Sequence, residues 1–207
     1  EIAGPGSINF FLKKSVWYPA IAQILTQTKE FGASKIGNNE PVLVEFVSAN
    51  PTGPLHVGHG RGAAYGDSIA RLLKTVGYRV CAEYYINDAG RQMNILATSV
   101  WLRYLEVCGE EFVFPSNAYR GAYVGEIAQQ LFSQYGKHFF KPAELVFKDI
   151  PADEPLGGNK EAHIDALILK AKTLLGVVDY EKIFNAGLTS ILLDIKEDLS
   201  AFRVNFD

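Results

Sequence analysis

The sequence contains few cysteines and no long apolar run. Its 207 residues hold only Cys81 and Cys108, with no CxxC pair. Two isolated cysteines exclude a disulfide framework and a four-ligand zinc site, and they favour two reduced, buried thiols. No apolar segment approaches the ~20 residues that cross a bilayer, and no basic segment followed by an apolar stretch opens the chain. The sequence predicts a soluble, cytoplasmic protein without a membrane partner.

A large excess of charge of either sign is also absent. Lys and Arg total 20 and Asp and Glu total 23, which gives a net charge of -3. This balance provides no global attraction to a polyanion, so any nucleic-acid contact would come from a local basic face. The 48% of hydrophobic residues is enough for a substantial core. The length predicts one large domain, or one and a half.

The centre of the chain has the pattern of a strand, a helix and a second strand. Residues 42–47 are nearly all apolar and β-branched or aromatic, which indicates a strand buried on both faces of a parallel sheet. Residues 56–76 repeat apolar side chains at helical spacing up to Gly77, and residues 78–87 alternate as a strand. The fold class is α/β, with a partial doubly wound, Rossmann-like parallel sheet and a mostly helical insertion.

Weaker patterns flank this unit. We expect a strand at residues 8–12, a linker at 33–40 and an exposed, mobile loop at 148–160. The expected helices cover residues 16–31, 90–106, 119–135, 164–175 and a last long segment that starts at Asp179.

The segment EFVSANPTGPLHVGHGRG brings His56 and His59 to the start of the central helix. At a spacing of three, the two imidazoles lie side by side next to N–H groups without intrahelical partners, which favours an anion. Gly58 lets a flat ring or a phosphate approach the backbone. Surface or capping histidines are the ordinary alternative. A metal site needs a third ligand, and the only other histidines, His138 and His163, are remote in sequence.

Glu45 is a carboxylate inside an otherwise apolar strand, which is costly unless a cation or hydrogen bonds meet it. An arginine guanidinium offers two parallel donors that an ammonium group cannot match, so an arginine ligand fits this position. The alternative is an internal pair with Arg71 or Lys74. Asn50 precedes a proline, which is also a common way to open a turn.

These residues together resemble a known family. His56, Val57, Gly58 and His59 resemble the HIGH motif of class I aminoacyl-tRNA synthetases. The longer strings at residues 49–59 and 85–92 are similar to the arginine-specific member of that class. The resemblance covers nearly the whole chain, and its motifs are specific between residues 45 and 92.

The resemblance implies that arginine is activated with ATP to arginyl-adenylate and then transferred to tRNA(Arg) by the full-length enzyme. Mg²⁺ is expected with ATP, and the protein is expected to be a monomer. The implied catalytic residues are His56 and His59, as donors to the phosphate oxygens. The implied ATP-binding residues are these two histidines with Gly53, Pro54 and Gly58. The implied arginine-binding residues are Glu45, Ser48 and Asn50, with Asn87, Asp88 and Gln92 as further pocket residues.

The resemblance also predicts that the chain is divided into four structural parts. Residues 1–38 would end an N-terminal appended domain, 39–106 would be the first half of the catalytic domain, 107–178 an insertion near the acceptor end of tRNA, and 179–207 a long helix returning to the catalytic core. Aromatic and basic residues of the insertion could stack bases, but core packing is favoured; these are Tyr119, Tyr123, Phe139 and Phe140 beside Lys137 and Lys141. The chain starts at Glu1 and has no Lys-Met-Ser-Lys signature, so we expect a fragment that is inactive alone.

Two other functions stay open. A small nucleotidyltransferase also uses an HxGH pair on a similar fold, and it would be complete at about this length and would turn over ATP or CTP without tRNA. A noncatalytic RNA-binding relative of the synthetases would bind RNA and ignore both ATP and arginine.

Overall fold

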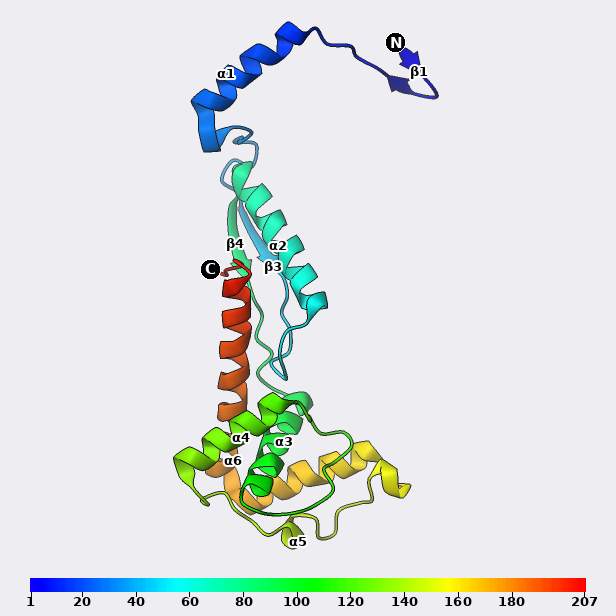
Figure 1. Cartoon of the computed structure of the whole chain (residues 1–207), viewed down its shortest axis with the longest axis vertical. Helices are drawn as coiled ribbons and strands as arrows, with labels where there is room; N and C mark the ends of the chain where they lie inside the picture. The colour runs from blue at the N-terminus through cyan, green and yellow to red at the C-terminus, as the bar shows by residue number, and fades with distance from the viewer. The chain divides into compact units, whose positions relative to one another are not determined.

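The computed structural model describes residues 1–207 except for the side chain of Ala3. Its strands are β1 (Ile2–Ala3), β2 (Ser7–Ile8), β3 (Pro41–Glu45) and β4 (Arg79–Glu83). Its α-helices are α1 (Trp17–Gln27), α2 (Val57–Thr75), α3 (Arg91–Val107), α4 (Ala122–Tyr135), α5 (Ala143–Val146) and α6 (Lys160–Ala201) (Figure 1). Short 3-10 turns cover Lys14–Val16, Thr28–Glu30 and Glu154–Leu156. Within the described residues, no helix is long and apolar enough to span a membrane.

The chain divides into two compact units, residues 1–43 with 68–81, and residues 44–67 with 82–207. The first unit begins with a small antiparallel hairpin in which Ile2 pairs with Ile8. The predicted strand at residues 8–12 is therefore wrong beyond Ile8. The predicted helix at 16–31 is also too long, because Thr28 has a φ of 50° and ends α1.

The apolar side chains of α1 are not buried. Helix α1 has no buried residue, and Ile24 and Leu25 are 45% and 73% exposed. Helical spacing alone predicts which side chains share a face, but burial requires a second element on that face. The described contacts of α1 are chiefly with the 3-10 turns on either side of it.

Strands β3 and β4 form a two-stranded sheet joined through α2, as the βαβ pattern predicts. They run parallel, because Glu40 O accepts from Arg79 N at one end and Glu83 O accepts from Phe46 N at the other. Both strands alternate between exposed and less exposed residues, so the prediction that residues 42–47 are buried on both faces is wrong. A sheet with one covered face leaves every second side chain in contact with solvent.

Both strands are also shorter than predicted. After β3, Val47 and Ser48 have φ values of 66° and 40°, which a strand cannot contain. The predicted helices that border this region are confirmed to within one or two residues: α2 runs from Val57 to Thr75 and α3 from Arg91 to Val107.

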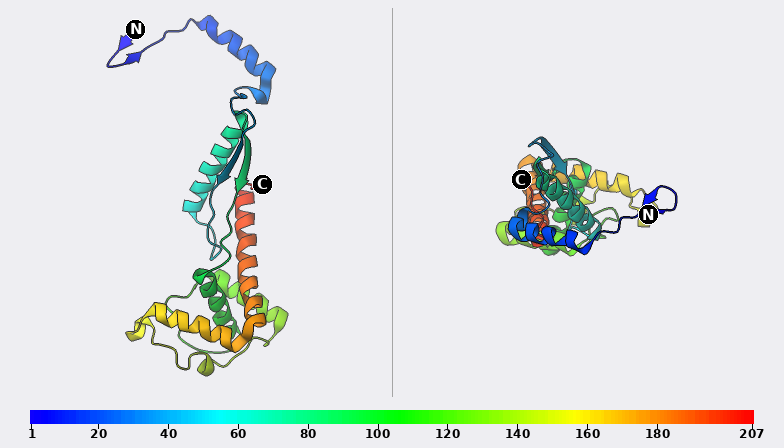
Figure 2. Two further views of the ribbon diagram at one scale, coloured as in Figure 1. Left: turned by 180° about the vertical axis from the view of Figure 1, so that it is seen from behind. Right: turned by 90° about the horizontal axis from the view of Figure 1, so that it is seen from above.

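The core of the second unit lies among α3, α4 and α6, which pack against one another (Figures 1 and 2). Trp101 of α3 is fully buried, and its indole N–H donates to Phe139 O at 2.9 Å. Helix α6 contains a non-helical residue, Gly176, at φ 72° and ψ 173°. The predicted break at Gly176 between two helical segments is confirmed.

The segment 148–160 is mainly loop but is not wholly exposed. Asp153 is 7% exposed, and its carboxylate accepts hydrogen bonds from Ser116 N, Ser116 Oγ and Glu154 N. Burial raises the pKa of Asp153, but these hydrogen bonds outweigh it and the net shift is downward. The expectation of two buried cysteines is also wrong, because Cys81 is exposed and Cys108 is half-buried.

Candidate functional site

The two histidines of the HxGH sequence lie together at the start of α2. Their rings stack with centroids 3.8 Å apart and planes inclined by 21°. His59 N and Gly60 N both donate to His56 O, so the chain turns into the helix directly at His56. The predicted side-by-side arrangement of the imidazoles is confirmed.

Each imidazole accepts a backbone hydrogen bond at Nδ1. Gly58 N donates to His56 Nδ1 at 3.1 Å, and His56 N donates to His59 Nδ1 at 3.2 Å. The proton of a neutral ring then sits on Nε2, which remains available as a donor to a ligand. These two N–H groups therefore contact the rings and, contrary to the prediction, are not free for an anion. A ligand at this turn can instead accept hydrogen bonds from the Nε2 atoms of the two histidines.

Burial, followed by the charge of His56, lowers the pKa of His59. This histidine is therefore neutral near pH 7, and its Nε2–H can donate without a positive charge. A Cβ at Gly58 would lie 2.9 Å from His56 Cε1. The flat ring that approaches Gly58 is thus the imidazole of His56, and the absence of a side chain at Gly58 preserves the stack.

The loop between β3 and α2 is fixed by neighbours from other segments. Ser48 Oγ accepts from Tyr85 N at 3.1 Å, and Ala49 O accepts from the Tyr84 hydroxyl at 2.9 Å. At the loop's far end, the Tyr123 hydroxyl of α4 donates to Thr52 O at 2.7 Å. The same hydroxyl would lie 3.1 Å from a Cβ at Gly53. Pro54, the other predicted ATP contact of this loop, is exposed.

Three predicted pocket residues form one amide cluster. Asn50 Nδ2 donates to Gln92 Oε1 at 2.7 Å, and Asn87 Nδ2 donates to Asn50 Oδ1 at 3.1 Å. All three side chains are exposed to solvent. The cluster therefore holds Asn50 between the end of β4 and the start of α3, with polar groups still reachable by a ligand. Asp88 is also exposed, and the structure assigns it no contact in this cluster.

Glu45 is the last residue of β3 and is exposed. The premise that its carboxylate is buried in an apolar strand is wrong, because side chains at alternate positions of β3 face solvent. Among the described side chains, the Glu45 carboxylate has no hydrogen bond or ion pair. The exposed carboxylate is therefore open to a ligand.

Tyr123 is a supporting residue whose role the sequence did not reveal. It is one of the aromatic residues of the insertion for which core packing was predicted, and it is half-buried against the core. Its hydrogen bond to Thr52 joins residues 71 positions apart, which no local pattern could indicate. Phe139, from the same aromatic set, is fully buried in the core.

The remaining histidines have structural contacts. His138 Nε2 lies 3.0 Å from Asp179 Oδ2, and His163 Nδ1 lies 2.6 Å from Pro151 O. Among the described side chains, no group of three His, Cys, Asp or Glu residues could hold a metal ion.

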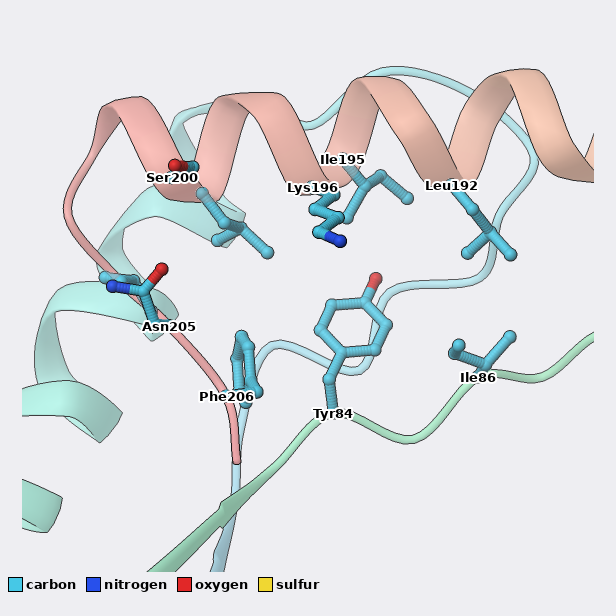
Figure 3. Close-up of a pocket in the computed structure, with 10 residues that line it drawn as sticks. Tyr84, Ile86, Leu192, Ile195, Lys196, Ser200, Asn205 and Phe206 are labelled. Atoms are coloured by element: carbon cyan, nitrogen blue, oxygen red, sulfur yellow. The ribbon is translucent and has the colours of Figure 1, made fainter.

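An apolar cavity of about 350 Å³ adjoins the segment that follows β4 (Figure 3). Tyr84 and Ile86 line it on one side, and α6 contributes Leu192, Ile195 and Lys196 on the other. Phe206 also lines it and packs edge-on against Tyr84, with ring centroids 5.4 Å apart. Because the Tyr84 hydroxyl bonds to Ala49 O, this cavity and the histidine-bearing loop share a supporting side chain.

Comparisons with known proteins match both the fold and the histidine-bearing loop between β3 and α2. Residues 20–111 match the family described as tRNA synthetases class I (R), catalytic domain. This match covers both histidines of the HxGH sequence and the amide cluster.

Within that class its relatives are arginine–tRNA ligases. It is 56% identical over 207 residues to the arginine–tRNA ligase of Legionella pneumophila strain Corby, and 56% identical over 207 residues to that of Thioalkalivibrio sulfidiphilus. A crystal structure described as an arginyl-tRNA synthetase of Campylobacter jejuni matches 95% of the chain with a TM-score of 0.69 and 29% identity, over 36% of its own length. The chain spans 35% of the length of these two curated relatives.

Proposed function

We propose that the chain forms the part of an arginyl-tRNA synthetase that holds ATP and arginine during adenylation. The stacked His56 and His59 pair, with Nε2 donors at the first turn of α2, is the observation that carries this proposal. In the whole protein, the arginine carboxylate attacks the α-phosphorus of ATP, pyrophosphate leaves, and the arginyl group passes to tRNA(Arg).

The histidines act as donors to the phosphate oxygens, where negative charge grows in the transition state. Their Nδ1 atoms are already occupied by backbone N–H groups, so the ring orientations are set before the ligand arrives. Gly53 and Pro54 border the nucleotide beside them, and Mg²⁺ enters with the phosphates of ATP. A donor fixed in advance costs no reorganisation during the reaction and is worth about 3 kcal/mol.

Glu45 and Asn50 are the proposed arginine contacts. The exposed carboxylate of Glu45 pairs with the guanidinium through two hydrogen bonds. Asn50, fixed by Asn87 and Gln92, binds the α-amino group. Ser48 supports this loop through Tyr85 N, and Asp88 lies in the same segment as Asn87.

The four parts predicted from the sequence remain the proposed organisation, with the insertion over residues 107–178 and the return helix over 179–207. Gly176, where the α6 backbone is non-helical, lies close to the second boundary and supports it. We also propose that the whole protein is a cytoplasmic monomer.

The test is a chimera in which these 207 residues replace the matching third of the Legionella pneumophila relative. The chimera should catalyse arginine- and tRNA-dependent ATP–pyrophosphate exchange. Substituting His56→Ala or His59→Ala should lower the exchange rate about 100-fold, because each removes one fixed donor to the phosphate. The Michaelis constant for arginine should change much less.

Two controls accompany this test. His138→Ala in the chimera removes an imidazole that contacts Asp179 and should leave the exchange rate unchanged. The isolated chain should show no exchange, because it spans 35% of the relatives' length. Turnover of ATP or CTP by the isolated chain without tRNA would instead support a nucleotidyltransferase. An active chimera with unchanged rates in both histidine variants would reject the proposed donor role.

Glu45→Gln in the chimera tests the arginine contact separately. An exposed pair contributes little, so arginine binding should weaken by about 1 kcal/mol, or roughly fivefold, with ATP binding unchanged. Glu83→Gln, at the end of the neighbouring strand β4, is the matched control and should leave arginine binding unchanged. Equal losses in the two variants would remove Glu45 from the arginine pocket.

A further inference from the structure

A separate cavity of about 390 Å³ lies at the start of α4, outside the site described above. Its lining comes from the end of α3 and from the first turns of α4. The lining residues are Arg103, Glu106, Val107, Arg120, Gly121, Ala122 and Gly125. Two guanidinium groups therefore border one cavity in a chain whose net charge is negative.

Both arginines are anchored on one short segment. The Arg103 guanidinium carbon lies 3.9 Å from the centroid of the Phe114 ring. Arg120 donates from Nη2 to Phe114 O at 2.9 Å, and from Nε and Nη2 to Pro115 O at 3.3 and 3.0 Å. Two positively charged guanidinium groups beside the same residue, Phe114, repel each other unless a negative charge lies nearby.

The cavity contains a single carboxylate. Glu106 Oε2 accepts from Arg103 Nη1 at 2.7 Å, so this pair is locally neutral. The partners of Arg120 are carbonyl oxygens, which orient its guanidinium and leave its charge in place. The two arginines and Glu106 sum to a charge of +1, and an anion would be attracted.

The third wall is the N-terminus of α4. Gly121 precedes the helix without a side-chain cap, and the N–H groups of the first two helical residues have no intrahelical partners. The third, Val124 N, donates to Gly121 O at 3.1 Å. A side chain at Gly121 would collide with the Tyr123 ring, so packing accounts for that glycine.

Gly125 has no such packing reason. A Cβ there would meet nothing within 4 Å, although glycine inside a helix costs stability relative to alanine. Because Gly125 has no side chain, the backbone of α4 stays accessible from the cavity.

We propose that Arg103, Arg120 and the first turn of α4 bind a phosphate group of an RNA strand. Arg120, Gly121 and Ala122 are exposed, so a phosphodiester with neighbours on both sides can reach them. This inference rests on the proposed function for its choice of RNA. The guanidinium groups and the helix N-terminus by themselves define a site for a tetrahedral oxyanion.

The test is binding of a fluorescein-labelled, 12-nucleotide single-stranded RNA to the full 207-residue chain, followed by anisotropy at several salt concentrations. Arg120→Gln should weaken binding about fivefold and lower the slope of log affinity against log salt by about one. Glu106→Gln should strengthen binding, because it removes the only negative charge of the cavity. Opposite effects from these two neighbours would not arise from a general loss of structure.

Two control variants remove one positive or one negative charge at positions outside the cavity. Lys148→Gln and Glu181→Gln alter exposed residues outside the cavity, and both should leave the affinity within about twofold of the unaltered chain. Gly125→Asp places a carboxylate in open space and leaves the bonds of Arg120 intact, so it should weaken binding even if Arg120→Gln disturbs the Phe114–Pro115 segment. Equal effects of Arg120→Gln and Lys148→Gln, or no effect of Gly125→Asp, would overturn the site.

A competition arm distinguishes the source of the phosphate. With ionic strength held constant, the RNA complex should persist in ~10 mM inorganic phosphate, because a strand makes several contacts. Displacement below about 1 mM would assign the cavity to free phosphate and overturn the RNA proposal. The experiment does not involve His56 or His59, so its failure would leave the adenylation proposal to be judged by the chimera alone.

Discussion

At the scale of single residues, the arrangement of His56 and His59 follows from where their Nδ1 atoms find partners. Both accept backbone N–H groups of their own turn, and the rings stack at 3.8 Å. Two stacked imidazoles disfavour a shared positive charge, which agrees with the lowered pKa of His59. His59 is therefore suited to donate a hydrogen bond as a neutral ring.

This geometry predicts how His59 titrates. Its pKa in the folded chain should lie below the ordinary 6.5, as followed by NMR of the imidazole ¹³Cε1–¹H signals. His56→Gln should raise the pKa only partly, because burial is the larger cause of the shift and persists in that variant. A His59 midpoint at or above 6.5 in the unaltered chain would contradict the stacked arrangement.

The sign of the linked stability change follows from the same shift. A histidine with a lowered pKa binds fewer protons in the folded state than in the unfolded state. Its contribution to stability is therefore fully present above pH 6.5 and is lost as the pH falls through the lowered value. His59→Asn should reduce this part of the acid sensitivity in thermal unfolding, whereas His138→Asn provides a comparison at another histidine.

At the scale of elements, α2 is positioned by its contact with the residue that follows β3. Gly66 lies over the Phe46 ring, and a Cβ there would be 2.2 Å from Phe46 Cγ. Phe46 in turn packs against Phe206, with ring centroids 4.6 Å apart. The absence of a side chain at Gly66 thus allows the histidine-bearing helix to approach this aromatic pair.

Two glycines of α2 should respond in opposite directions to alanine. Gly66→Ala should lower the free energy of unfolding by about 1–3 kcal/mol, because the methyl group overpacks against Phe46. Gly62→Ala adds the same methyl group in open space, so it should stabilise the helix by up to about 1 kcal/mol. Urea unfolding of both variants measures the difference. Stabilisation by Gly66→Ala would show that α2 does not rest on Phe46.

At the scale of the whole molecule, the two compact units bury their side chains to different extents. Trp17 in the first unit is 58% exposed, whereas Trp101 in the second is fully buried. The buried apolar cluster draws largely on α3, α4 and α6, and α1 contributes no buried residue to it. The first unit is therefore expected to have the lower local stability.

The two tryptophans report this difference. Acrylamide should quench the fluorescence of Trp17 readily and that of Trp101 little, because quenching requires access from solvent. Trp17→Phe should remove the quenchable component, and the remaining emission should follow unfolding of the second unit only. Strong quenching that persists in Trp17→Phe would contradict the buried position of Trp101.

The sequence predicted the parts of this protein that depend on neighbouring residues. The span of α2 and α3, the break at Gly176 and the pairing of His56 with His59 all follow from helical spacing and from glycine, over distances of one or two turns. The family was recognisable for the same reason, since its motifs are contiguous strings between residues 45 and 92.

Contacts between distant residues were decided by the tertiary structure. The Tyr123 bond to Thr52, the amide cluster that joins Asn50 to Asn87 and Gln92, and the exposure of Glu45 depend on which elements pack together. Strand and helix patterns specify which side chains share a face, but not whether another element covers that face. For that reason the burial of β3 was predicted wrongly, while the side-by-side arrangement of the two imidazoles was predicted correctly.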